Sequence, residues 1–183
     1  MHELSPVGDL VLRDARAMSA LADPERLALH DVLHRQGPAT VGELASLLGS
    51  KPRAIAAHLE AFEEVGLVER VDAERWAAIG KGIFFEIPED PDGERAARQL
   101  SNVMFLQYVD VPGRWVSECE PKLSLEWARA AGLLNVRLLV TPDELRQLQA
   151  ALERLFEPFL RREPAAAPSE AAHVRILSYF MPG

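Results

Sequence analysis

The sequence predicts a mainly helical α+β fold, and three observations lead to it. Apolar residues between positions 24 and 65 recur with the 3.6-residue period of amphipathic helices. From Leu67 to Ile87 the period shortens to two residues, which is typical of half-buried strands. Beyond Glu94, helical periodicity alternates with two short strand-like stretches, residues 133–140 and 173–180.

The first two helices are marked by start and stop signals. A helix is expected over residues 11–21. Asp23-Pro24-Glu25 then combines an N-cap, a proline suited to the first helical position and an acid that favours the positive end of the helix dipole. Gly37-Pro38 is a stop signal, so the second helix is expected to end there.

A capping box opens the third helix. Thr40 is followed three residues later by Glu43, the spacing at which each side chain bonds the other residue's backbone N–H. This helix is expected over residues 41–48. Ser50 is expected to cap the fourth helix, which runs to Gly66.

A ribbon follows these helices. Residues 67–71 are expected to form a strand, and Arg75-Trp76 begins its return. Gly80-Lys81-Gly82 fits a bulge or the wing tip, and residues 83–87 close the ribbon. Three helices and a ribbon in this order describe a winged helix-turn-helix, expected over residues 10–88, a module that inserts one helix into the major groove of DNA.

The prolines and acids of residues 88–93 predict a boundary between two domains. The second domain, over residues 94–183, is expected to be an α+β segment that serves dimerisation or effector binding. Its long first helix is expected to contribute Leu100, Val103 and Met104 to the interface of a homodimer.

Composition narrows the class of protein. The 183 residues are 48% hydrophobic and 26% charged, which is ordinary for a globular chain. No apolar run approaches the ~20 residues that span a bilayer, and the N-terminus lacks a signal-peptide pattern. Cys119 is the only cysteine, which excludes an internal disulfide. We therefore expect a cytoplasmic protein without membrane contact.

The charge pattern predicts where DNA would bind. The net charge is −8, and residues 1–88 carry −5, because 9 Lys and Arg face 14 Asp and Glu. This acidity argues against a generic nucleic-acid coat. Residues 44–59, however, contain no acid and include Lys51, Arg53 and His58. Binding is expected through this local patch.

Each residue type in the patch suggests a role. The guanidinium of Arg53 suits a guanine edge, and the amine of Lys51 suits a phosphate. Ala54 and Ala57 are small enough for close approach to bases, whereas His58 fits DNA contact and structural packing equally well. The expected DNA-binding residues are Ser50, Lys51, Arg53, Ala54, Ala57 and His58 on the helix, with Arg75 and Lys81 on the wing.

Four segments carry a family resemblance: residues 20–27 (ALADPERL), 40–45 (TVGELA), 57–59 (AHL) and 66–69 (GLVE). Together they resemble ArsR-type winged-helix repressors over residues 16–87. The resemblance implies a homodimer whose helix over residues 50–66 enters the major groove. The C-terminal half resembles, more weakly, a companion domain of some regulators of this type.

The sequence predicts no metal site. ArsR-type regulators often sense metals through cysteines on the helix before the recognition helix, but residues 41–48 contain neither Cys nor His. Cys119 alone is a poor site for a soft metal. His30 and His34 have ligand spacing, yet two ligands do not make a site, and we expect an exposed pair without metal.

A small hydrophobic effector is the remaining candidate ligand. Aromatic side chains with a few polar groups are typical of small-molecule pockets, although the same residues also fill cores and dimer interfaces. The candidate effector-binding residues are Tyr108, Trp115, Trp127 and Tyr179.

These observations favour a non-enzymatic DNA-binding transcriptional regulator that acts as a repressor. No nucleophile elbow, phosphate loop or metal-binding helix motif indicates catalysis, and no cofactor is implied. The acidity of residues 1–88 favours the alternative, a winged-helix module that binds a protein and not DNA.

Overall fold

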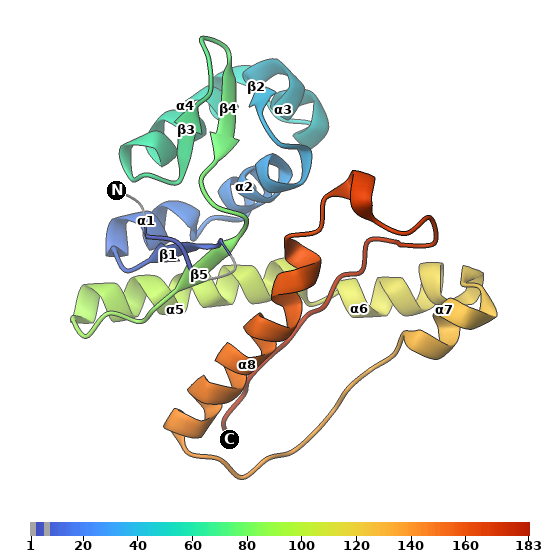
Figure 1. Cartoon of the computed structure of the whole chain (residues 1–183). Helices are drawn as coiled ribbons and strands as arrows, with labels where there is room; N and C mark the ends of the chain where they lie inside the picture. The colour runs from blue at the N-terminus through green and yellow to red at the C-terminus, as the bar shows by residue number, and fades with distance from the viewer. Residues whose placement is uncertain (1–2, 6–7) are drawn as a thin grey trace. The chain divides into compact units, whose positions relative to one another are not determined.

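The computed structural model describes residues 3–5 and 8–183 (Figure 1). The chain forms two compact units, Met1–Leu139 and Val140–Gly183. These units differ from the segments expected from sequence, 10–88 and 94–183, because the helix after the acidic linker packs within the first unit. No helix in the described part of the chain has both the length and the apolar character that a membrane crossing needs.

Helices make up most of the first unit. In chain order they are α1 (Ala15–Leu21), α2 (Pro24–Gln36), α3 (Val41–Leu48), α4 (Pro52–Glu64), α5 (Pro91–Tyr108), α6 (Val111–Arg114) and α7 (Leu125–Ala130). A π-helical turn over Trp115–Cys119 and a 3₁₀ turn over Glu120–Lys122 follow α6. The second and third helices are confirmed over residues 24–36 and 41–48. The fourth helix is also confirmed, but it spans Pro52–Glu64 and ends before Gly66, to which the sequence predicted that it would run.

The strands of the first unit form two small sheets. Strand β2 (Ala39–Thr40) and strand β3 (Val68–Arg70) both pair antiparallel with β4 (Arg75–Ala78). Strand β1 (Leu10–Leu12) pairs in parallel with β5 (Ile83–Phe85), with Leu10 opposite Ile83. The wing is therefore the β3–β4 hairpin.

Two expectations for these elements were wrong. The first helix begins at Ala15 and not at residue 11, because residues 10–12 form β1. Residues 83–85 do not close the ribbon, because they pair with β1 and not with β4. A two-residue period predicts which face of a strand is buried, but it does not predict which strand lies next to it.

The core lies between the helices of the first unit. Its largest fully buried side chains include Met18 and Leu21 of α1, Phe62 of α4 and Leu100 of α5. Helix α5 packs against α1, and its start inside the expected linker is secured by Asp90, whose carboxylate accepts the N–H of Gly93 at 2.8 Å. Leu100 therefore packs inside its own chain, which corrects its expected place in a dimer interface.

The second unit contains α8 (Pro142–Leu160) and a 3₁₀ turn at Pro164–Ala166. Thr141 and Glu144 form the capping box at the start of α8, and Pro158 lies inside its last turn. The strands expected over residues 133–140 and 173–180 do not form. Among the side chains that the structure describes, none after Leu100 is buried.

Candidate nucleic-acid interface

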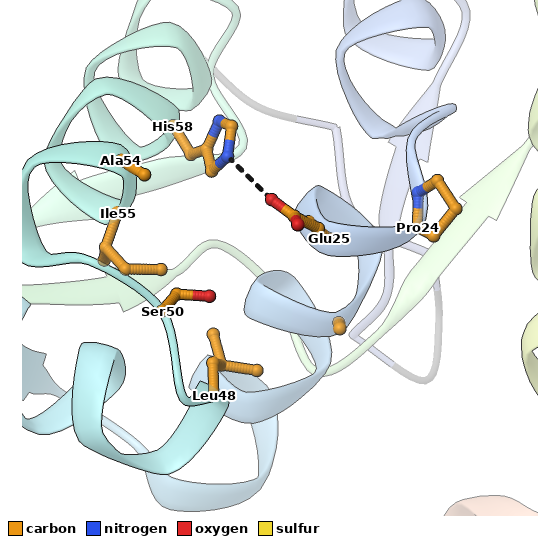
Figure 2. A pocket seen from close by; sticks show the side chains of 8 residues that line it. Pro24, Glu25, Leu48, Ser50, Ala54, Ile55 and His58 are labelled. Atoms are coloured by element: carbon orange, nitrogen blue, oxygen red, sulfur yellow. Dashed lines mark ion pairs between the residues drawn. The ribbon is translucent and has the colours of Figure 1, made fainter.

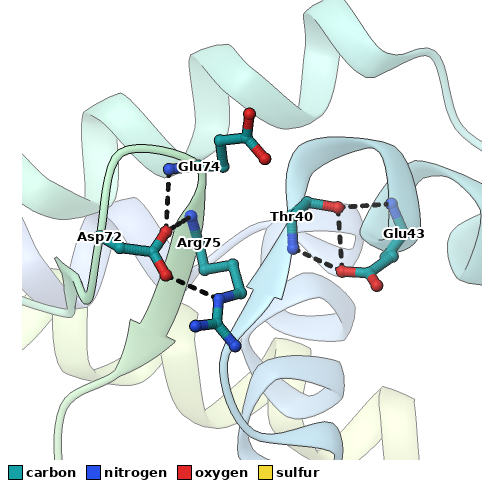
Figure 3. Close-up of polar contacts among 5 residues, drawn as sticks. All are labelled: Thr40, Glu43, Asp72, Glu74 and Arg75. Atoms are coloured by element: carbon teal, nitrogen blue, oxygen red, sulfur yellow. Dashed lines mark hydrogen bonds and ion pairs between the residues drawn. The ribbon is translucent and has the colours of Figure 1, made fainter.

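Local hydrogen bonds at the start of α3 hold the helix-turn-helix in place (Figure 3). The carboxylate of Glu43 accepts the backbone N–H of Thr40 at 2.8 Å, and the Thr40 hydroxyl accepts the N–H of Glu43 at 3.3 Å. The backbone N–H of Thr40, and its hydroxyl, which donates to the same carboxylate at 2.9 Å, lower the pKa of Glu43 below its ordinary value, so the box persists near neutral pH. The capping box expected from the sequence is confirmed.

The turn between α3 and α4 is built by Gly49. Its φ of 62° is left-handed, a conformation that glycine adopts without steric cost, and the next N–H, that of Ser50, bonds the carbonyl of Ala45 at 3.0 Å. Ser50 therefore closes α3 and does not cap α4. Lys51 occupies the N-cap of α4 without a side-chain hydrogen bond, so the first turn of this helix lacks a protein cap.

Helix α4 has one buried and one exposed face. Ile55, Leu59 and Phe62 are buried in the core, which fixes the orientation of the helix. Lys51, Arg53 and Ala57 are exposed, whereas Ala54 and His58 are half-buried. The two strong cations of the acid-free patch thus face solvent.

His58 is held by α2 (Figure 2). The Nε of Arg26 donates to Nδ1 of His58 at 3.3 Å, and Nε2 of His58 lies 3.8 Å from a carboxylate oxygen of Glu25. Because Nδ1 accepts a hydrogen bond, the proton of the neutral ring lies on Nε2, toward Glu25. The structure thus shows a packing contact for His58, and its contact with DNA stays a prediction.

A small pocket lies beside this contact. It has a volume of about 240 Å³ and opens between the start of α2 and the N-terminal half of α4 (Figure 2). Its lining residues are Pro24, Glu25, Ala28, Leu48, Ser50, Ala54, Ile55 and His58. Ser50 and Ala54, both expected at the DNA interface, therefore line this pocket at its α4 side.

The tip of the wing is an acidic turn (Figure 3). One carboxylate oxygen of Asp72 accepts the backbone N–H groups of Glu74 at 2.9 Å and Arg75 at 2.8 Å. Its other oxygen accepts the Nε of Arg75 at 2.7 Å. These bonds lower the pKa of Asp72, so the wing carries a permanent negative charge beside its candidate DNA-binding cation.

Lys81 lies outside the wing tip, which corrects its expected place. The hairpin turns at residues 71–74, where the Val71 N–H bonds the Arg75 carbonyl at 2.9 Å. Lys81 follows β4, and its N–H bonds the carbonyl of Gly8 at 2.8 Å. The glycines on either side of Lys81 predicted a wing tip because glycine is common in every kind of tight connection and does not identify which one is formed.

The acids at the far end of α4 are partly compensated. Glu63 bonds Arg70 of β3 at 3.3 Å, and the guanidinium of Arg70 lies over the ring of Trp76 at 4.0 Å. Arg70 therefore contacts both α4, through Glu63, and the wing, through Trp76. The basic character of the candidate interface rests on Lys51 and Arg53.

The candidate effector residues do not converge on a described pocket. Tyr108 donates its hydroxyl to Asp31 at 2.5 Å, and the amide of Gln107 donates to the same oxygen at 2.8 Å. Trp115 and Trp127 are half-buried, and Tyr179 belongs to the second unit. None of these four residues lines the pocket between α2 and α4. None of them lines a second pocket, which lies beside the start of α5.

The expectation of an exposed histidine pair was wrong. His30 is fully buried and His34 is half-buried, because this face of α2 turns into the core. Among the described residues, no three His, Cys, Asp or Glu side chains gather in a way that could hold a metal ion.

Comparison with known proteins agrees with this geometry. Residues 21–71, which include α2, α3, α4 and β3, match the family described as a helix-turn-helix domain. The chain contains a helix-turn-helix domain. Domains of this kind are typical of DNA-binding regulators. No curated protein matches the chain.

Sequence reasoning missed two functional contacts in this domain. The signal for Asp72 was present, since an Asp side chain in a turn commonly accepts the backbone N–H two residues further on. The contact of Arg26 with His58 joins residues 32 positions apart, and no local pattern marks it.

Proposed function

We propose that this chain is a sequence-specific transcriptional regulator, a repressor that binds a near-palindromic operator as a homodimer. The observation that carries the proposal is the exposed start of α4. This helix buries its apolar face, lacks a side-chain cap and presents Lys51 and Arg53 to solvent, within a stretch that holds no acid.

The proposed contacts follow from side-chain chemistry. Arg53 forks onto a guanine in the major groove, and Lys51 meets a phosphate near the uncapped N-terminus of α4. Ala57 is exposed and allows close approach to a thymine methyl group. Arg75 reaches flanking backbone from the wing, where Asp72 weakens its attraction for phosphate.

The positions of three other residues modify the interface. Ser50 and Ala54 lie at its edge, beside the pocket. His58 acts as a positioning residue, because its contacts with Arg26 and Glu25 connect α4 to α2. Control by a small hydrophobic ligand remains a prediction, which a thermal-shift screen with tryptophan fluorescence would test.

Selection of genomic DNA fragments by the purified full chain at ~150 mM salt tests the proposal, because counterion release suppresses non-specific binding there. Recovery of an inverted repeat supports it. Arg53→Ala should then weaken operator binding about 5- to 150-fold, the equivalent of about 1–3 kcal/mol. Arg129→Ala, which removes an equal charge from the exposed surface of α7, should leave the affinity unchanged.

The alternative is a winged-helix module that binds a protein. The net charge of −5 over residues 1–88 favours it. If the folded chain recovers no specific sequence, and Arg53→Ala and Arg129→Ala behave alike on every DNA tested, the DNA-binding proposal is wrong.

A further inference from the structure

An extended apolar segment leaves α7 and leads toward α8 (Figure 1). Residues 133–139 read LLNVRLL and adopt neither helix nor strand. Five of these seven residues are large and apolar, and all of them are exposed. Their exposed fractions are 92% for Leu133, 83% for Leu134, 62% for Val136, 59% for Leu138 and 103% for Leu139.

The backbone of this segment is unpaired as well. In the described part of the chain, no hydrogen bond joins residues 133–139 to any other segment; the nearest bonds are those of Ala131 and Thr141 in the adjoining helices. A stretch that exposes both its apolar side chains and a row of N–H and C=O groups is a template for strand pairing. The segment is therefore available to pair with another strand.

The order of residues in this segment indicates which strand would pair with it. The stretch is nearly palindromic about Val136: a pair of leucines stands at each end, with Asn135 and Arg137 on either side of the centre. We propose that residues 133–139 pair antiparallel with the same residues of a second copy of this chain, in the register centred on Val136. This pairing specifies the homodimer of the proposed function and rests on it.

Every position finds a compatible partner in this register. Leu133 lies opposite Leu139 of the second copy, and Leu134 lies opposite Leu138. Val136 meets its own equivalent on the same face as the second leucine pair, because side chains alternate along a strand. Asn135 lies opposite Arg137, so the amide oxygen accepts a hydrogen bond from the guanidinium and no like charges meet.

The neighbouring symmetric registers are energetically less favourable. A centre at Arg137 would place two guanidinium groups directly opposite each other, and like charges in that position are destabilising. A centre at Asn135 would place Arg137 opposite Leu133, where a charge meets an apolar side chain. The symmetric dimer is therefore restricted to the register centred on Val136.

Cysteine cross-linking tests the register. Cys119 is exposed and free, so the test uses the full chain with Cys119→Ala. Directly opposed residues have Cα atoms about 4.5–5.5 Å apart, within the range of a disulfide. Val136→Cys should therefore give a covalent dimer on oxidation. Leu134→Cys should not, because its two equivalents lie four positions apart along the ladder, about 14 Å. A mixture of Leu134→Cys with Leu138→Cys should cross-link.

Charge substitutions provide a second test that spares the apolar side chains. Asn135→Arg places a cation opposite Arg137 of the other copy, and this happens twice in the symmetric dimer. The substitution should therefore raise the dimer dissociation constant about 2- to 30-fold, measured by analytical ultracentrifugation. Adding Arg137→Glu should restore the affinity, because opposite charges then face each other. Asn102→Arg, on the exposed surface of α5, is the matched control and should have no effect.

The outcomes separate this inference from the proposed function. A chain that binds its operator as a dimer, but cross-links no better through Val136→Cys than through Leu134→Cys, would overturn the pairing alone. Cross-linking at position 136 without sequence-specific DNA binding would support the pairing and overturn the regulator. A chain that stays monomeric at micromolar concentration would overturn both the pairing and the homodimer.

Discussion

The imidazole rings of His30 and His34 meet edge to face, with 4.4 Å between their centroids. Neither ring nitrogen of His30 has a hydrogen bond of good geometry within the described chain, and Nε2 of His34 also lacks one. Burial, together with the electrostatic effect of His34, lowers the pKa of His30 to about 3. Burial also lowers the pKa of His34, opposed by the carboxylates of Asp31 and Asp9.

Acid should therefore destabilise the first unit through His30. The folded state disfavours the protonated ring, so stability from this residue is constant above the unfolded pKa of 6.5 and falls as the pH drops from there toward 3. At pH 5 the loss is about 2 kcal/mol. Urea unfolding at pH 7.5 and pH 5 measures it. His30→Leu should remove most of the difference, and an unchanged difference would refute this account.

The wing should bind DNA more strongly without Asp72. Asp72→Asn keeps an oxygen for the turn N–H groups but removes the charge that pairs with Arg75. Because Arg75 is then available for phosphate, the slope of log affinity against log salt should steepen by about one unit. Asp110→Asn removes an equal charge at α6, where no side-chain cap bond is lost, and should not alter the slope. Equal slopes in both variants would contradict the prediction.

Arg26 should stabilise the junction of α2 and α4. Arg26→Met keeps much of the side-chain volume but removes the donor to Nδ1 of His58. We expect a loss of about 1–3 kcal/mol in the free energy of unfolding, because the residue is partly buried and its hydrogen bond is charge-assisted. Arg16→Met on the exposed side of α1 is the control. Urea denaturation compares the two, and an equal loss in both would rule out a specific role for Arg26.

The two capping boxes offer a matched pair. Thr40→Ala should destabilise the first unit by about 1 kcal/mol, since it removes the acceptor for the Glu43 N–H. Thr141→Ala removes the same contact from α8 in the second unit. Hydrogen exchange resolved by segment should show faster exchange in α3 only for the first variant. Faster exchange in α3 after Thr141→Ala would show that the units are energetically coupled.

The sequence by itself determined the local features of this protein. Helices over residues 24–36, 41–48 and 52–64 were predictable, because caps and stop signals act across three or four residues. The exposure of Lys51 and Arg53 followed from the same periodicity, since a helix that buries Ile55 and Leu59 turns its other face outward.

Only the tertiary structure decided the contacts between distant residues. It paired β5 with β1 and not with the wing, buried His30 in the core, and joined Arg26 to His58. A periodic pattern identifies the face of an element that is buried, but it carries no information about which element covers that face. That choice depends on how the helices and strands pack together.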